Sequence, residues 1–136
     1  MNRLLGTIVG VNSNGHVFQV VVQVGSVEIT AVALDFTPSD PDAAVGKKAG
    51  IVFKEAETAL ALDLPPHSLS IRNRLPCRVV AVEDDGILAN VRLDYEGNPL
   101  CALITSGSAR DLAVAPGKMV NALIKSTEVM IDLEGE

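Results

Sequence analysis

Short runs of apolar residues, separated by polar turns, follow one another along the whole chain. The runs are rich in Val, Ile and Leu, which is typical of β-strands. The polar turns 12–15 and 83–86 each end in a glycine, which can take the positive φ that a hairpin needs. Two polar segments, 106–112 and 38–43, are each long enough for one helical turn. The pattern predicts strands over residues 5–11, 17–24, 27–33, 50–53, 59–62, 76–82, 87–93, 99–104, 119–125 and 129–133.

The second half of the chain repeats the first half. When the sequence is shifted by 71 positions, fourteen residues match without a gap, from Asn2 and Asn73 near the start to Glu57 and Glu128 near the end. Such a duplication predicts two small units, 1–64 and 65–136, joined where Pro65 and Pro66 stiffen the chain. Five short strands and one helical turn per unit predict an all-β protein made of two OB-like barrels in tandem.

Composition narrows the function classes. Aromatic residues make up only 3% of the chain, so thin cores of Val, Leu, Ile and Ala are expected. The net charge of −6 would repel a nucleic-acid backbone, and aromatic platforms for stacked bases are missing. We expect neither a membrane span nor a signal peptide, because no apolar run approaches the required length. A cytoplasmic protein is therefore predicted.

The cysteines and histidines give no sign of a metal site. Cys77 and Cys101 lie in strand-like segments without CxxC or His spacing, which predicts two buried, reduced thiols. His16 falls in a predicted turn and His67 in the connection between units, and neither has a second ligand at a spacing typical of metal sites. Both are expected to be solvated.

Four motifs of the second unit resemble those of a known family. Residues 70–76 read S-I-R-N-R-L-P, and the later motifs are A-L-I-T-S-G-S (102–108), L-A-V-A-P-G-K (112–118) and A-L-I-K-S (122–126). They resemble, in order, the S-A-R-N-x-L-x-G, A-x-[IV]-T-x-x-S, L-G-L-x-x-G-x and A-x-[IV]-K-A motifs of Mop domains, which belong to the TOBE type. Cys77 replaces a usual Gly and Ser126 a usual Ala. The first unit resembles the family mainly through the repeat.

The resemblance implies a di-Mop, molbindin-like protein. It implies homo-oligomers, either dimers or trimers, with oxyanion sites between units, and molybdate or tungstate as the only ligand. Storage, homeostasis or sensing of these anions in the cytoplasm is the function it implies. The chain has neither a Gly-rich phosphate loop nor a helix-turn-helix motif, so as given it is neither a transporter ATPase nor a repressor. Because Met1 lies close to the first predicted strand, we expect a free-standing protein; a fragment of a longer protein is the alternative.

A site for a doubly charged tetrahedral oxyanion needs hydrogen-bond donors on every side and no carboxylate. The motifs supply such donors: a guanidinium fork, an ammonium group and several hydroxyls. Thr105 also lies where a strand gives way to the predicted helical turn, whose free N–H groups favour an anion. Taken singly, such residues are more often surface residues or helix caps, and the hypothesis depends on their occurring together. The predicted oxyanion-binding residues are Ser70, Arg72, Thr105, Ser108, Lys125 and Ser126.

The first unit retains little of this set. Lys54 is the repeat partner of Lys125, but Met1 stands at the position of Arg72, and Leu34 stands at that of Thr105. One strong site per chain is therefore expected, with little contribution from Lys54.

Two other function classes compete with this interpretation. A detached regulatory or oligomerisation module of a molybdate transporter ATPase would act mainly through protein contacts, and partner-dependent folding or binding would favour it. An enzyme is not predicted, because no nucleophile lies at a recognisable spacing from a base and the acidic residues gather in turns.

Overall fold

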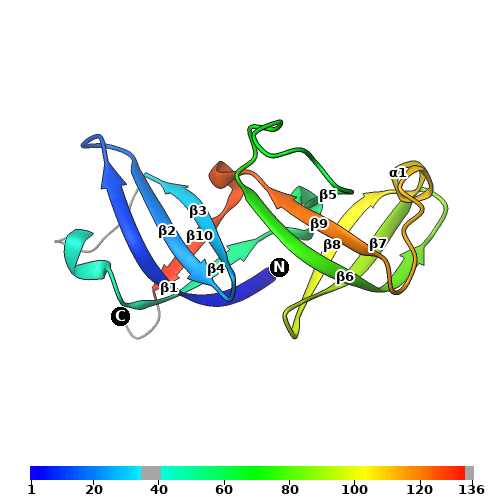
Figure 1. The fold of residues 1–136 in the computed structure, drawn as a ribbon, viewed down its shortest axis with the longest axis horizontal. Helices are drawn as coiled ribbons and strands as arrows, with labels where there is room; N and C mark the ends of the chain where they lie inside the picture. The colour runs from blue at the N-terminus through cyan, green and yellow to red at the C-terminus, as the bar shows by residue number, and fades with distance from the viewer. Residues whose placement is uncertain (35–40, 134–136) are drawn as a thin grey trace.

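Two five-stranded antiparallel sheets make up most of the computed structural model, which describes residues 1–34 and 41–133 (Figure 1). The first sheet has the order β10-β4-β1-β2-β3 and the second β5-β9-β6-β7-β8. The first contains β1 (Asn2–Ser13), β2 (Phe18–Val24), β3 (Val27–Ala33), β4 (Lys48–Phe53) and β10 (Met130–Leu133). The second contains β5 (Ala59–Ala61), β6 (Asn73–Asp84), β7 (Leu88–Tyr95), β8 (Asn98–Thr105) and β9 (Met119–Ile124). The predicted all-β class with five strands per sheet is confirmed.

Short helices lie at equivalent places in the two units. The 3-10 helices η2 (Glu55–Glu57) and η3 (Ser126–Glu128) follow β4 and β9. The helical turn predicted over 106–112 is confirmed as α1 (Ser106–Asp111). Its counterpart, predicted over 38–43, is matched only in part by η1 (Pro41–Ala44), and residues 38–40 lie outside the described ranges.

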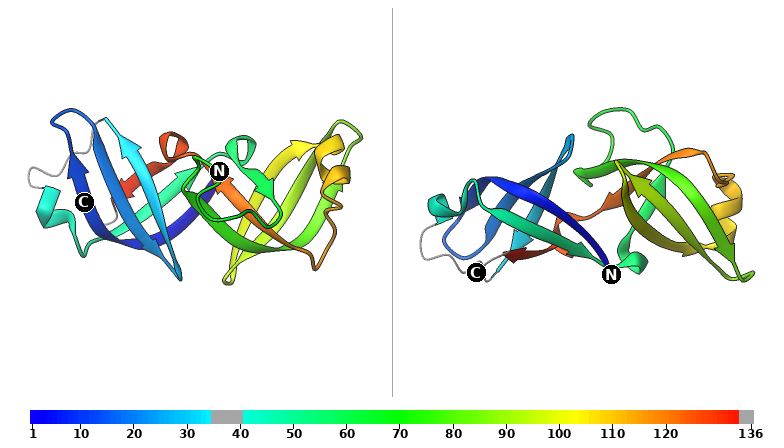
Figure 2. Two further views of the ribbon diagram at one scale, coloured as in Figure 1. Left: turned by 45° about the horizontal axis from the view of Figure 1, so that its top comes forward. Right: turned by 90° about the horizontal axis from the view of Figure 1, so that it is seen from below.

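The last strand of each sequence repeat is exchanged between the sheets. β5 pairs with β9 of the second sheet, and β10 returns to pair with β4 of the first. Both views in Figure 2 show the red end of the chain within the first sheet. The sequence predicted instead that each unit ends with its own last strand. The sequence repeat cannot distinguish pairing within a unit from exchange between units, because β5 and β10 occupy equivalent positions in the two repeats.

An ion pair holds the returning strand. The guanidinium Nη1 of Arg3 donates to Oδ2 of Asp132 on β10 at 2.7 Å. Gly50 lies beneath this guanidinium, since a Cβ added there would come within 2.7 Å of Nη2 of Arg3. A side chain at position 50 would therefore displace Arg3 from its place over β4.

The core alternates with the strand period, as half-buried sheets require. Leu75, Cys77 and Val79 are fully buried on β6, and the residues between them are more exposed. Burial raises the pKa of the Cys77 thiol to about 12. Cys101 is a free thiol too but only half-buried, because its side chain alternates with the buried Leu100 and Ala102 on β8. The prediction of two buried thiols is therefore wrong for Cys101.

Two buried asparagines join the sheets reciprocally. Asn73 accepts a hydrogen bond from the Thr30 N–H at 2.8 Å and donates one to the Thr30 carbonyl at 2.9 Å. Asn2 makes the same pair of bonds with the backbone of Cys101, both at 2.8 Å. Thr30 and Cys101 are themselves repeat partners on the edge strands β3 and β8. Each amide thus occupies the backbone groups that a further strand would use.

The hairpin turns β2–β3 and β7–β8 meet at one end of the interface. The Glu96 carboxylate accepts hydrogen bonds from the N–H and the hydroxyl of Ser26, at 3.2 and 2.7 Å. The buried Tyr95 donates its hydroxyl hydrogen to the Val24 carbonyl, and burial raises the pKa of Tyr95 to about 12. These contacts link the same two sheets that the asparagines join.

Replacing Asn73 by Ala should destabilise the fold by roughly 2–3 kcal/mol, because the Thr30 N–H and carbonyl would be left buried without partners. Urea unfolding measures this change. Asn12→Ala is the matched control, since Asn12 is exposed at the end of β1. Equal stability of the two variants would contradict the proposed role of the amide.

The Glu96 contact should depend on pH. The Ser26 hydroxyl, the Tyr95 hydroxyl and the Ser26 N–H, in that order of effect, lower the pKa of Glu96 in the folded protein. Its contribution is therefore present above the unfolded-state pKa and is lost as the pH falls through the folded-state pKa. In an NMR titration, Ser26→Ala should raise the pKa of the Glu96 carboxyl toward its ordinary value. An unchanged titration curve would show that Ser26 does not hold this carboxylate.

Candidate oxyanion site

Strand register places Arg72 and Lys125 at adjacent strand ends. Asn73 on β6 is paired with Ile124 on β9, the last pair of that ladder. Arg72 and Lys125 are the next residues outward, and Ser126 begins η3 directly afterwards. We call Arg72, Lys125 and Ser126 the basic cluster. Two residues that are 53 positions apart in sequence are thus brought together by the pairing of β6 with β9.

The donors of the basic cluster are available to a ligand. Arg72 and Lys125 are exposed and Ser126 is half-buried. Within the described ranges, none of their side chains has a hydrogen-bond or ion-pair partner. The Lys125 carbonyl accepts the Glu128 N–H at 2.9 Å, which fixes the backbone of η3 beside the lysine. η3 also packs against β3, the strand that Asn73 holds. The backbone of the cluster is therefore rigidly placed, while its cationic groups are unengaged.

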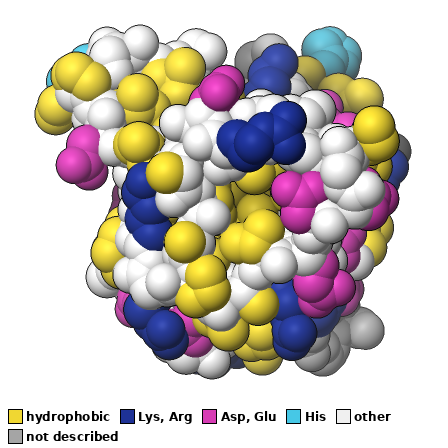
Figure 3. All heavy atoms as spheres, turned by 90° about the vertical axis from the view of Figure 1, so that its right-hand side faces the viewer, with side chains coloured by type: hydrophobic (Ala, Val, Ile, Leu, Met, Phe, Trp, Pro, Cys, Tyr) yellow, Lys and Arg dark blue, Asp and Glu magenta, His cyan; other side chains and the backbone are white. Residues whose placement is uncertain are grey.

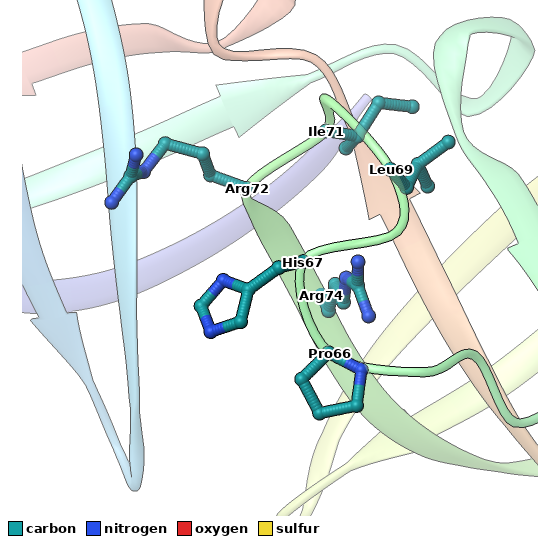
Figure 4. A pocket seen from close by; sticks show the side chains of 6 residues that line it. All are labelled: Pro66, His67, Leu69, Ile71, Arg72 and Arg74. Atoms are coloured by element: carbon teal, nitrogen blue, oxygen red, sulfur yellow. The ribbon is translucent and has the colours of Figure 1, made fainter.

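The chain that leads into Arg72 forms a loop over a cavity of about 300 Å³. Figure 4 shows His67 within this loop and Arg74 beneath it, whereas the Arg72 side chain extends away from Leu69 and Ile71. His67 takes a left-handed conformation with φ of 60°. His16 and His67 are both exposed, as predicted. Ser70 is exposed in the same loop, two residues before Arg72, without a described partner.

Thr105 and Ser108, which we call the hydroxyl pair, lie at the start of α1. The Thr105 hydroxyl oxygen accepts the Ser108 N–H at 3.1 Å, so Thr105 is the N-cap of the helix. Thr105 also donates its hydroxyl hydrogen to the Ser108 oxygen at 2.9 Å. The hydroxyl hydrogen of Ser108 remains available for a ligand. Thr105 is thus a helix cap first, and Ser108 is the better donor of the two.

The two groups of predicted residues lie apart within one chain. The hydroxyl pair lines a cavity of about 470 Å³ together with residues 56–59, which include η2 of the first unit. The basic cluster lies instead beside β3, through η3. In Figure 1, α1 stands at the far end of the second sheet and the red η3 near the middle of the molecule. One chain alone therefore does not gather all six residues around one anion.

Asn73 is the residue whose importance the sequence motif did not reveal. It stands between Arg72 and Arg74 and is fully buried, where it bonds to β3 as described above. It positions Arg72 without offering a donor to a ligand. Its identity with Asn2 across the repeat was the available signal, but a match in sequence does not show that both side chains cross between sheets.

Charge on the molecular surface is locally mixed. On the face at the α1 end, basic and acidic side chains alternate around hydrophobic ones, without a broad area of one sign (Figure 3). Among residues 1–34 and 41–133, no group of three or more His, Cys, Asp or Glu side chains could hold a metal ion. No helix in these ranges is long and apolar enough to cross a membrane.

A profile of the TOBE domain family matches residues 69–131. Among curated proteins, the chain is 42% identical over 85 residues to the molybdenum import ATP-binding protein ModC of Yersinia pseudotuberculosis, covering 62% of this chain and 23% of the relative. It is 43% identical over 63 residues to the molybdenum-pterin-binding protein MopB of Rhodobacter capsulatus, covering 46% of this chain and 23% of the relative. The chain thus spans about a quarter of the length of these relatives.

The fold of the whole chain also has a close match among solved structures. The crystal structure of the cytoplasmic molybdate-binding protein ModG, with molybdate bound, superposes with a TM-score of 0.85. The match covers 97% of this chain and 95% of ModG at 24% sequence identity. This likeness extends over both sheets and therefore includes the exchanged strands.

Proposed function

Residues 69–131 of the chain belong to the TOBE domain family, and we propose that the protein binds molybdate or tungstate through the basic cluster of this domain. The observation that carries the proposal is the pairing of β6 with β9, which sets the unengaged Arg72 and Lys125 at adjacent strand ends. The molybdenum-pterin-binding protein MopB, a relative, and the molybdate-binding protein ModG, which has the same fold, support this choice of ligand.

The donor set suits a fully deprotonated dianion. Arg72 offers a planar fork of N–H groups, Lys125 a point charge, and Ser126 and Ser70 hydroxyls. An oxyanion without a proton can accept from all of these donors. Hydrogen phosphate carries a proton that needs an acceptor, and neither cationic group of the set can accept a hydrogen bond. Molybdate and tungstate should therefore be preferred to phosphate, and their size distinguishes them from sulfate.

The complete site forms between copies of the chain in this proposal. The hydroxyl pair lies beside η2 rather than beside Lys125, so the Ser108 hydroxyl that completes the shell comes from a second copy. Exposed apolar side chains on β1, β6 and β9 support a homo-oligomer, either a dimer or a trimer. They are Leu5, Val9, Val80 and Met119, with 43–62% of each residue exposed.

Reversible anion capture in the cytoplasm, for storage, homeostasis or sensing, is the role that we propose. The cytoplasmic ModG, whose fold the chain shares, supports this role. The 42% identity to ModC favours one second candidate, a regulatory module of a molybdate transporter ATPase that acts mainly through protein contacts. Tight anion binding by the isolated protein favours the first role, and binding that requires a transporter partner favours the second.

Arg72→Ala or Lys125→Ala should weaken molybdate binding by about 2–5 kcal/mol, because each removes a charged donor from a desolvated anion site. Isothermal titration calorimetry measures the change. Arg78→Ala is the matched control, since Arg78 is exposed on the same strand, β6, outside the cluster. Unchanged affinity in both cluster variants would refute the assignment.

Thermal-shift titration tests the selectivity for molybdate and tungstate, which should stabilise the protein more than sulfate or phosphate does. Equal stabilisation by all four anions would contradict this selectivity.

Light scattering at micromolar concentration should give the mass of a dimer or a trimer. Burial of the exposed apolar side chains favours association, and the hydroxyl pair must reach the basic cluster of another copy. A strictly monomeric protein, with and without molybdate, would show that the site is not completed between copies.

A further inference from the structure

The first unit carries a close counterpart of the basic cluster. Asn2 pairs with Phe53 at the end of the β1–β4 ladder, as Asn73 pairs with Ile124 in the second unit. Met1 and Lys54 therefore stand at the strand ends where the second unit has Arg72 and Lys125. The lysine is retained, and a ladder of the same register presents it. This part of the first unit therefore has the same strand pairing and the same lysine as the proposed anion site of the second unit.

The next residue differs in charge. Glu55 begins η2, where Ser126 begins η3 in the second unit. Its Oε1 accepts a hydrogen bond from the Met1 amino nitrogen at 2.5 Å, so the carboxylate reaches across the strand ends toward the position that corresponds to Arg72. The hydrogen bond from the Met1 amino group lowers the pKa of Glu55, which is consequently ionised at neutral pH. A negative charge thus lies beside Met1, the counterpart of Arg72, and on the residue that directly follows Lys54, the counterpart of Lys125.

We propose that Glu55 closes the first unit's copy of the oxyanion site, with its carboxylate standing where a bound oxyanion would place its oxygen atoms. The inference rests on the proposed function, because the second unit defines what an open site contains. The carboxylate accepts the hydrogen bond of the Met1 amino group, and its charge repels a second anion. Lys54 is therefore not expected to act as a ligand. One strong site per chain follows.

The sequence repeat supplies both substitutions for the test. Glu55→Ser gives the first unit the residue that stands at position 126, and Ser126→Glu gives the second unit the residue at position 55. Native mass spectrometry and calorimetry with sodium molybdate report the number of sites per chain. Glu55→Ser should raise it from one to two, with the new site more than about tenfold weaker, since Met1 has no guanidinium. Ser126→Glu should abolish the strong site.

Asp63→Ser is the matched control. Asp63 is an exposed acidic residue of the same unit and lies outside the cavity that the hydroxyl pair lines, so its removal should leave the number of sites unchanged. Thermal unfolding checks that each variant is folded. A folded Glu55→Ser protein that still binds one molybdate would overturn the inference, and so would an equal gain in Asp63→Ser. If the wild type binds no molybdate, the proposed function fails, while a site gained in Glu55→Ser alone would still show that Glu55 closes it.

Discussion

The structure depends on a pair of side-chain amides that hold the two sheets together. Each asparagine lies at the start of a long strand and satisfies the N–H and carbonyl of a residue on the edge of the other sheet. Buried edge groups of this kind are costly when left unpaired. The exchange of β5 and β10 strengthens the same interface with backbone bonds. The units are therefore parts of one structure, in which each completes the sheet of the other.

The proposed site is a consequence of this interface. Arg72 precedes Asn73, and Lys125 follows the residue paired with Asn73, so the bonds that fix Asn73 to Thr30 also fix the ends of both strands. Because the strand ends are already fixed, only the side chains of Arg72 and Lys125 must be ordered when the anion arrives, which limits the entropic cost of binding. The same strand pairing exists around Asn2, where Glu55 takes the place of the hydroxyl donor Ser126 and Met1 that of Arg72. The proposal assigns the closing of this cluster to Glu55.

Much of the fold could be predicted from the sequence. The Val-rich runs and glycine turns predicted the strands, and the ungapped repeat predicted two similar sheets. The exchange of β5 and β10 could not be predicted, because both strands have the same pattern and only tertiary pairing decides between them. At the site, the motifs predicted that Arg72 and Lys125 serve one ligand, and the register of β6 with β9 sets the two residues at adjacent strand ends. It did not show that Thr105 and Ser108 lie beside η2, since that placement depends on how the units pack.

The central claim is that the anion is held at the end of the β6–β9 ladder. Tungsten scatters anomalously, so a crystal of the wild-type protein grown with tungstate locates the ligand directly. The account predicts a strong anomalous peak within hydrogen-bond distance of the Arg72 guanidinium and the Lys125 ammonium, and no peak at Lys54. A peak at Lys54 of equal height, or ordered tungstate only at other places, would contradict it.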